Sequence, residues 1–294
     1  MKVLVVGAGG MVGQAVVKTC YLSDDEVIAF NHHELNIADA QEVSAALESV
    51  RPEFVINCAA WTDVEACEFN PLEANRVNAI GPENLARSSR QVGAGLITIS
   101  TDYVFDGSKE GFYTQRDNPN PQSVYAVTKL KGEHCAQKAN ARCIVVRTGF
   151  IFGVGGRNFL SRLLQRARSG ESIAAIVDAW GTPTCSLDLA KRLRQLALID
   201  LPGVYHVVNS GAGASYAEFT EVALEAAGFS NPIVDFVSES SLKRRAPRPR
   251  NSRLRCLISE AIGLEALRDW REAVKDFAIL QADSGFATAS ETRE

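Results

Sequence analysis

The chain has 294 residues, of which 46% are hydrophobic, and a formal net charge of −4 at pH 7. This length and apolar content suffice for one large α/β domain or two unequal lobes with a packed core. The negative charge argues against a general nucleic-acid-binding protein, which needs a cationic face. The sequence also lacks a long uninterrupted apolar run that would predict a membrane helix. We therefore expect a globular, cytoplasmic protein with no nucleic-acid or membrane partner.

Short β-branched runs alternate with helical patterns along the first half of the chain. The predicted strands are Lys2–Val6, Glu26–Phe30, Phe54–Asn57, Gly95–Ser100 and Cys143–Arg147. The predicted helices are Gly10–Cys20, Ala38–Val50, Leu72–Val92, bent or divided at Gly81-Pro82, and Tyr125–Asn140. Each right-handed crossover between parallel strands needs a helix on a sheet face. The alternation therefore predicts an α/β fold with a Rossmann-type, doubly wound parallel sheet.

The pattern is looser beyond residue 148. A glycine-rich turn at Gly153–Gly156 precedes a predicted helix at Asn158–Ser169, a strand at Ile173–Val177, a helix from Leu187 and a strand at Val204–Asn209. We expect residues 1–148 to form the nucleotide-binding domain and residues 149–256 to form mainly a smaller, C-terminal substrate-binding lobe. Segments near 186–203 and 257–282 are predicted to return to the first domain. Residues 283–294 have little to bury and are predicted to be a flexible tail.

A glycine turn follows the first predicted strand in the stretch VLVVGAGGMVG. Gly7, Gly10 and Gly13 permit a tight turn, close approach of backbone amides to a pyrophosphate, and close packing of the helix on the sheet. The helix N-terminus also favours an anion. The turn therefore predicts a dinucleotide site, in which Met11 and Val12 are included, and a turn without a ligand is the alternative.

The second predicted strand leads into VIAFNHHELN, with Asn31 where an acidic residue is common. An acid there would bind the 2′-hydroxyl of the adenine ribose and repel a 2′-phosphate. Glu34 is displaced by several residues. This pattern favours NADPH, with NADH as the alternative. His32 and His33 are predicted to be exposed loop residues.

The predicted strand Gly95–Ser100 is followed directly by the polar residues Thr101 and Asp102. Ligands of open α/β sheets bind at this end of the strands. Tyr125 and Lys129 are four residues apart, which places both on one face of a helix. A nearby ammonium favours the phenolate form of a phenol whose ordinary pKa is near 10. We expect chemistry from these residues, with a solvated tyrosine–lysine pair as the alternative.

Further motifs occur in order along nearly the whole chain. They are NCAAWTDVEACE (Asn57–Glu68), STDYVFDG (Ser100–Gly107), DAWGTPT (Asp178–Thr184), RPRNSRL (Arg248–Leu254) and DWREAV (Asp269–Val274). With the glycine and Tyr-x-x-x-Lys motifs, they resemble the dTDP-4-dehydrorhamnose reductases of the extended short-chain dehydrogenase/reductase superfamily. The resemblance implies hydride transfer from the nicotinamide to the C4 keto carbon of dTDP-4-dehydro-6-deoxy-L-mannose, which gives dTDP-L-rhamnose.

The resemblance also implies roles for individual residues. Tyr125 would donate the proton, Lys129 would stabilise the phenolate and hold the nicotinamide ribose, and Thr101 would hydrogen-bond the substrate oxygen. The further implied cofactor contacts are Asn36, Ile37, Ala59, Ala60 and Thr62. The further implied substrate contacts are Thr62, Val64, Asp102, Phe150, Arg248 and Asn251. For Asp102, an acceptor of loop amides is an equal alternative, and Tyr103–Gly107 is predicted to lead away from the site.

The basic run LKRRAPRPRNSRLR, residues 242–255, contains seven Lys or Arg residues and no acid. A solvated loop, nucleic-acid binding and recognition of a nucleotide-sugar diphosphate are the alternatives, and the resemblance favours the diphosphate for part of the run. No metal site is predicted, because the first helix begins Gly13-Gln14-Ala15, without the glutamates described at a magnesium-linked dimer of some relatives. Seven scattered cysteines without a CxxC pair predict neither disulfides nor zinc.

Two other functions remain alternatives. An epimerase or dehydratase could use the same scaffold, but dehydratases typically carry Asp-Glu directly after the threonine, whereas this chain has Asp102-Tyr103. A non-catalytic regulatory subunit resembling the β subunit of methionine adenosyltransferase could also retain these motifs. The oligomeric state is open, and a homodimer is compatible with the resemblance.

Overall fold

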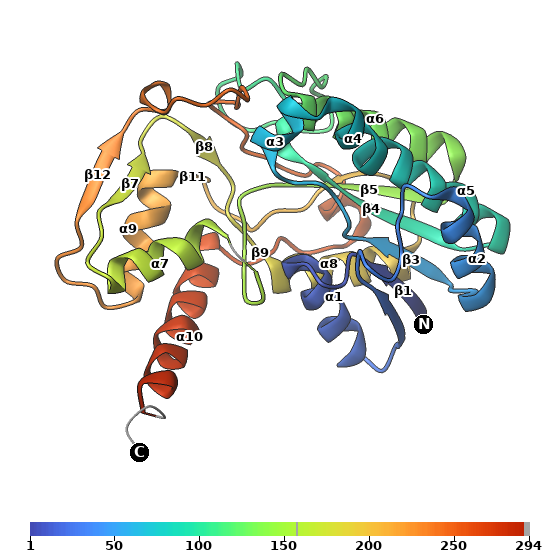
Figure 1. Ribbon diagram of the computed structural model, residues 1–294, viewed down its shortest axis with the longest axis horizontal. Helices are drawn as coiled ribbons and strands as arrows, with labels where there is room; N and C mark the ends of the chain where they lie inside the picture. Colours follow the sequence, from blue (N-terminus) through green and yellow to red (C-terminus); the bar gives the residue numbers. More distant parts are fainter. Residues whose placement is uncertain (157, 291–294) are drawn as a thin grey trace.

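The computed structural model describes residues 1–156 and 158–290, which form a central sheet flanked by helices and a smaller lobe beside it (Figure 1). The sheet has six parallel strands in the order β10-β5-β4-β3-β1-β2. Their bounds are β1 Lys2–Val6, β2 Glu26–Phe30, β3 Phe54–Asn57, β4 Gly95–Thr101, β5 Cys143–Thr148 and β10 Gly203–His206. The predicted doubly wound Rossmann-type sheet is confirmed.

Helices cover both faces of this sheet, as Figure 1 shows. One face carries α1 (Met11–Tyr21) and α8 (Ser186–Ile199), and the other carries α2 (Ala40–Val50), α5 (Gly81–Val92) and α6 (Val124–Ala139). Successive side chains of β1 point to opposite faces of the sheet. Val3 and Val5 pack in the core beneath α1 and α8, and Leu4 and Val6 pack in the core beneath α2 and α5. Parallel strands buried on both faces explain the continuous apolar runs in the sequence.

The helical segment predicted over Leu72–Val92 is divided, as its Gly81-Pro82 pair predicted. It consists of α4 (Pro71–Asn75), a π-helical turn (Arg76–Ile80) and α5, and the short α3 (Val64–Phe69) precedes it. Pro82 has no N–H to donate to the carbonyl of Asn78 four residues earlier. Gly132 of α6 packs against that carbonyl, where a Cβ would lie 2.1 Å from the oxygen. The break therefore allows close packing of α6.

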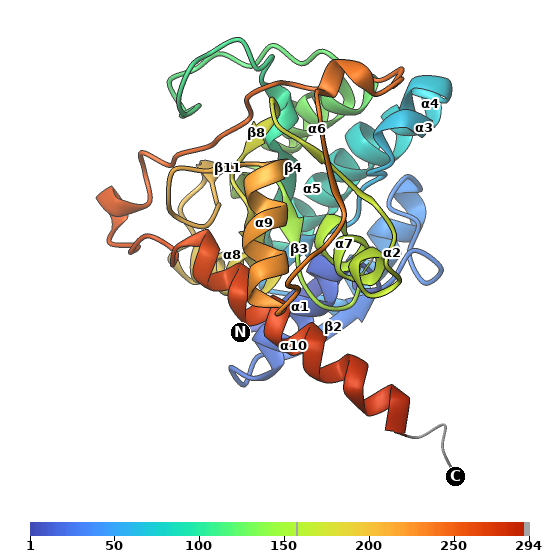
Figure 2. The ribbon, with the colours of Figure 1, turned by 90° about the vertical axis from the view of Figure 1, so that its left-hand side faces the viewer.

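The smaller lobe is built from short strand pairs and three helices around its own core (Figure 2). Its strands are β6 Ile151–Phe152, β7 Ile173–Ile176, β8 Trp180–Gly181, β9 Thr184–Cys185, β11 Ala214–Ser215 and β12 Val234–Val237. They pair as β12 with β7 and β6 with β9, both parallel, and β11 with β8, antiparallel. Its helices are α7 Phe159–Arg168, α9 Tyr216–Ala226 and α10 Trp270–Ser290. Short 3-10 turns occur at Asp102–Val104, Glu239–Ser241 and Glu260–Ile262.

The chain crosses between the two parts more than once. Helix α8 packs on α1, and Leu264 contacts the same core beneath the sheet. The chain between Trp270 and Ala278 instead packs in the core of the smaller lobe. Helix α10 continues to Ser290 and includes residues 283–290 of the segment predicted to be a flexible tail. Residues 291–294 of that segment lie outside the described residues. No described helix is long and apolar enough to span a bilayer.

Candidate active site

A cavity of about 590 Å³ lies at the carboxyl ends of β1, β3, β4 and β5, facing the smaller lobe. Thirteen of the predicted cofactor, substrate and catalytic residues line it: Gly10, Met11, Val12, Gly13, Ala59, Ala60, Thr62, Val64, Thr101, Asp102, Tyr125, Lys129 and Phe150. Parallel strands bring these residues together because all their carboxyl ends meet at one edge of the sheet. The cavity also contacts the lobe through Phe159 and Tyr216.

The glycine turn fits a dinucleotide on steric and electrostatic grounds. Gly7 has φ +78°, and a Cβ there would lie 2.5 Å from the backbone nitrogen of Ala59. A Cβ on Gly13 would lie 2.2 Å from the Gly7 carbonyl oxygen. Gly10 begins α1 without a side-chain cap, and the first turn contains no acid. The free backbone N–H groups of this helix end can therefore hold a pyrophosphate close to the chain.

Tyr125 and Lys129 lie on the first turns of α6, which begins after Ser123 as N-cap. Lys129 is 4% exposed, and its Nζ donates a 2.7 Å hydrogen bond to the carbonyl oxygen of Ile99 on β4. Burial lowers the pKa of Lys129 to about 8, although the Glu133 carboxylate opposes this. The ammonium is thus fixed to the end of β4.

The phenol of Tyr125 is protonated at neutral pH. Burial raises the pKa of Tyr125 above its ordinary value, and a hydrogen bond with Thr101 opposes only part of that rise. The resemblance implied that Lys129 would favour the phenolate, but burial has the larger effect here. A protonated phenol at this position can serve as a proton donor.

Thr101 and Asp102 form a hydrogen-bonded pair at the end of β4. The Thr101 hydroxyl donates to Asp102 Oδ1 over 3.1 Å and accepts from the backbone N–H of Tyr103 over 3.2 Å. The Ser252 hydroxyl donates to Asp102 Oδ2. Burial raises the pKa of Asp102 to about 6, because these hydrogen bonds oppose the burial without cancelling it. Asp102 is therefore mainly ionised at pH 7 and lines the cavity.

A buried ion pair supports this end of the sheet from below. Glu133 lies one turn beyond Lys129 on α6 and accepts from Nε and Nη2 of Arg147 on β5, the shortest of these contacts being 2.7 Å. The hydroxyl of Ser100 also donates to Glu133. Both side chains of the ion pair are less than a tenth exposed. No sequence pattern predicted this pair. The one indication in the sequence was that Glu133 follows Tyr125 by eight residues, on the same face of the helix.

The prediction that Tyr103–Gly107 leads away from the site is wrong for its first residue. Tyr103 lines the cavity, and its ring meets that of Tyr125 edge-on at a centroid distance of 6.2 Å and 84°. The 3-10 turn at Asp102–Val104 changes the direction of the chain directly after β4. The turn brings Tyr103 to the cavity wall, and no sequence pattern predicted this turn.

Tyr216 is a second aromatic residue of the cavity that sequence reasoning missed. It is the first residue of α9 and stacks on Phe150, with ring centroids 4.3 Å apart. Phe150 itself has φ +45°, a left-handed conformation that is uncommon for an aromatic residue and turns the chain directly after β5. The partner is sixty-six positions away along the chain, so only the tertiary fold could show this contact.

Several predicted contacts do not line the cavity. Asn36 Oδ1 accepts from the backbone N–H of Ala38, and Ile37 is buried against Gly81 of α5. Gly7 is half-buried and does not line the cavity. These residues shape the nucleotide-binding domain behind the cavity wall.

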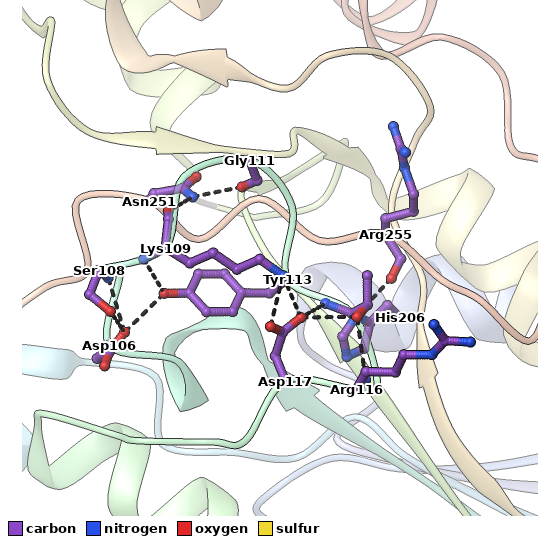
Figure 3. Close-up of polar contacts among 11 residues, drawn as sticks. Asp106, Ser108, Lys109, Gly111, Tyr113, Arg116, Asp117, His206, Asn251 and Arg255 are labelled. Carbon is purple, nitrogen blue, oxygen red and sulfur yellow. Dashed lines mark hydrogen bonds and ion pairs between the residues drawn. The ribbon is translucent and has the colours of Figure 1, made fainter.

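Asn251 and Arg248 also lie away from the wall. The Asn251 amide donates to the carbonyl oxygens of Lys109 (2.6 Å) and Gly111 (2.7 Å), as Figure 3 shows. Arg248 pairs with Glu65 over 3.5 Å. Both Asn251 amide hydrogens are used within the chain, and the substrate contact of Asn251 stays a prediction.

The loop held by Asn251 has its own polar network (Figure 3). The Tyr113 hydroxyl donates to Asp106 over 2.9 Å, and Lys109 pairs with Asp117 over 2.7 Å. Tyr113 also forms a backbone bridge with Leu254. The loop therefore anchors the segment around Ser252 against the main domain.

Glu34 lies closer to the end of β2 than its sequence position indicated. Its Oε2 accepts from the backbone N–H of Asn31 over 2.8 Å. Asn31 in turn contacts the glycine turn, since a Cβ on Gly9 would lie 3.4 Å from Asn31 Cβ. Asn31 does not line the cavity, but a carboxylate stands beside the position where an adenine ribose would be bound in such folds.

Comparison with known proteins agrees with this geometry. The family model described as "RmlD substrate binding domain" matches residues 1–281. The dTDP-4-dehydrorhamnose reductase of Streptomyces griseus is 35% identical over 279 residues, covering 93% of this chain and 91% of that protein. A probable dTDP-4,6-dihydroxy-2-methyloxan-3-one 4-ketoreductase of Streptomyces antibioticus is also 35% identical, over 280 residues and 94% of both chains.

Solved structures show the same architecture. A crystal structure of a dTDP-4-dehydrorhamnose reductase from Clostridium acetobutylicum has a TM-score of 0.92 at 33% identity and covers 96% of this chain and 99% of that one. The reductase from Bacillus anthracis, solved in complex with NADP, has a TM-score of 0.91 at 31% identity and covers 95% and 99%. This chain belongs to the dTDP-4-dehydrorhamnose reductase family. It is an NAD(P)H-dependent oxidoreductase that acts on a nucleotide sugar.

Within the described part of this family member, no three His, Cys, Asp or Glu side chains come together as a metal-binding group.

Proposed function

We propose that the chain reduces the C4 keto group of dTDP-4-dehydro-6-deoxy-L-mannose with NADPH in the cytoplasm, giving dTDP-L-rhamnose. The observation that carries this proposal is the convergence of Thr101, Tyr125 and Lys129 on one cavity beside the glycine turn. A buried phenol that keeps its proton, a hydroxyl and an ammonium are the groups that a carbonyl needs as it becomes an alkoxide. The family membership supports the choice of substrate class.

In this proposal each side chain has a separate role. The bound nicotinamide supplies the hydride. Tyr125 holds a proton at Oη and passes it to the oxygen that becomes an alkoxide. The Thr101 hydroxyl, which donates to Asp102 in the structure, turns to donate to that oxygen when the substrate is bound. Lys129 provides positive charge beneath the site, where its ammonium stabilises the phenolate left after proton transfer. Tyr103, Phe150 and Tyr216 restrict the access of water, which strengthens these electrostatic interactions.

Two observations bear on the choice between NADPH and NADH, and they favour different cofactors. A relative 31% identical was solved with NADP, which supports NADPH. The Glu34 carboxylate at the end of β2 disfavours a 2′-phosphate and supports NADH as the alternative. Rates measured separately with NADPH and NADH decide between them.

The test is oxidation of NADPH by the purified chain with dTDP-4-dehydro-6-deoxy-L-mannose made in situ, followed by identification of the product sugar. The proposal expects stoichiometric formation of dTDP-L-rhamnose. A different reduced sugar would indicate another ketoreductase, as the Streptomyces antibioticus relative illustrates. Tightly bound NAD that is reused without added NADPH would indicate an epimerase or dehydratase. No oxidation, together with capture of a synthetase partner, would favour the regulatory-subunit alternative.

A further inference from the structure

Ser252 is brought to the cavity by a segment that is fixed on both sides. Its backbone N–H donates to the Trp180 carbonyl over 2.8 Å, and Trp180 N–H donates to the Arg250 carbonyl over 2.7 Å. Two residues further along, Leu254 N–H donates to the Thr182 hydroxyl over 3.2 Å. Ser252 is only 1% exposed. Its side chain therefore has a defined position relative to the sheet.

The hydroxyl of Ser252 donates to Asp102, 150 positions earlier in the chain. The Thr101 hydroxyl donates to the other carboxylate oxygen, and backbone N–H groups at Asp102 and Tyr103 also contribute. Gly149 packs against the same carboxyl group, where a Cβ would lie 2.3 Å from Asp102 Oδ2. The carboxyl group is thus held in one orientation at the cavity wall.

The charged and titratable groups around this carboxyl group come from four elements. Tyr103 follows Asp102 in the 3-10 turn, Tyr125 begins α6 and Tyr216 begins α9. Arg244 and Arg248 of the basic segment lower the pKa of Tyr103 and of Tyr216. Asp102 raises the pKa of each of the three tyrosines, so the charge of this carboxylate affects the whole cluster.

We infer that Ser252 is a positioning residue, whose hydroxyl fixes the Asp102 carboxylate beside Thr101 as the anionic acceptor for a hydroxyl of the sugar nucleotide. The inference rests on the proposed function and gives the RPRNSRL motif a specific role. The other two hydrogen-bonding residues of this motif discussed above, Arg248 and Asn251, make structural contacts. Ser252 alone among the three reaches a side chain of the cavity wall.

Loss of the Ser252 hydroxyl should change the pH dependence of activity in one direction. Among the hydrogen bonds that lower the pKa of Asp102 against the effect of burial, the one from Ser252 has the largest effect. The carboxylate is present above its pKa of about 6 and is lost as the pH falls through that value. Removing the hydroxyl raises this pKa, so the acid limb of the kcat/KM profile moves to higher pH. A hydrogen bond to a charged group predicts a displacement of about one pH unit.

The experiment compares the Ser252→Ala and Ser252→Thr variants of the full chain with a matched control, Ser259→Ala. Ser259 is a buried serine seven residues along the chain that lines a different cavity. We expect Ser252→Ala to move the acid limb upward by about one pH unit and to raise KM for the nucleotide sugar more than it lowers kcat. Ser252→Thr keeps the hydroxyl and should retain the wild-type limb, and Ser259→Ala should match the wild type.

A second measurement keeps the inference separate from the proposed function. Carboxyl-labelled aspartate in the chain without substrate gives an NMR titration of Asp102, identified by its loss in Asp102→Asn. A raised titration midpoint in Ser252→Ala supports the inference even if the chain reduces a different sugar. An unchanged midpoint in a folded Ser252→Ala variant, or the same displacement in Ser259→Ala, overturns it. If Ser252→Ala does not fold, the Ser252→Thr variant decides. An acid limb of Ser252→Thr that is displaced from the wild-type limb also overturns the inference.

Discussion

Tyr125 is half-buried at the cavity with a raised pKa, so its phenol holds the proton that the proposed reaction needs. Replacing it with Phe removes the donor and leaves the ring packing against Tyr103. We expect Tyr125→Phe to lower kcat by about two to four orders of magnitude, the range typical of general acid catalysis. NADPH affinity, measured by fluorescence titration, should change little. Turnover equal to the wild type would exclude Tyr125 as the donor.

Lys129 is predicted to set an alkaline limit for activity. Its ammonium is present below its pKa of about 8 and is lost as the pH rises through that value. We therefore expect kcat/KM of the wild type to fall above about pH 8. The profile is measured at substrate concentrations below KM, where it reports the free enzyme. A profile that remains flat to pH 10, where an unperturbed lysine titrates, would contradict the assignment.

Glu34 is predicted to influence the choice between NADPH and NADH. Its carboxylate lies at the end of β2, where it would repel a 2′-phosphate. Glu34→Gln should raise the ratio of kcat/KM for NADPH to that for NADH by about fivefold, the effect of roughly one kcal/mol between two charges in a wet site. Glu26→Gln, at the opposite end of the same strand, is the control and should leave the ratio unchanged.

At the scale of single elements, α6 combines chemistry and support on one face. Tyr125, Lys129 and Glu133 recur every four residues, so each successive turn meets the end of β4 or β5. The helix is thereby fixed to the sheet through Ile99 and Arg147. The positions of Tyr125 and Lys129 thus depend on an ion pair that takes no part in the proposed reaction.

Glu133→Gln tests this dependence. It leaves Arg147 buried without a charged partner, which typically costs about 3–5 kcal/mol. It also removes the carboxylate that raises the pKa of Lys129, so the alkaline limb should move to lower pH. Urea unfolding and the kcat/KM profile measure the two effects. The control, Glu83→Gln, removes a more exposed helical ion pair and should cost less than about 1 kcal/mol.

At the scale of the whole molecule, the cavity lies between a sheet domain and a lobe that have separate cores. Trp270, which begins α10, is fully buried in the lobe core against Phe219. The glycine turn belongs to the other part. Loss of packing in the lobe should therefore affect the nucleotide sugar before the cofactor.

We predict that Trp270→Ala lowers the free energy of unfolding by about 3–5 kcal/mol through the cavity it leaves. Affinity for the nucleotide sugar should weaken more than affinity for NADPH, as measured by calorimetric titration of each. Circular dichroism during urea unfolding gives the stability change. Equal weakening of both ligands would show that the two cores do not act separately.

Local pattern predicted the strands, the helices, the glycine turn and the polar cavity residues Thr101, Asp102, Tyr125 and Lys129. The resemblance supplied Ala59, Ala60, Thr62, Val64 and Phe150. Glycines at fixed spacing, β-branched runs and the four-residue interval between Tyr125 and Lys129 are properties of neighbouring residues. Because parallel strands all end at one edge, the polar residues that follow them had to meet there. The family blocks added the expected chemistry.

The tertiary structure decided the contacts between distant segments. Ser252 meets Asp102, Arg147 meets Glu133 and Tyr216 meets Phe150 across long separations in the chain. In the folded chain Tyr103 also lines the cavity, and the Asn251 amide donates to the carbonyl oxygen of Lys109. Sequence periodicity reports which face a residue occupies on its own element, whereas these partners depend on how elements pack, and the pKa of each buried group follows from that packing.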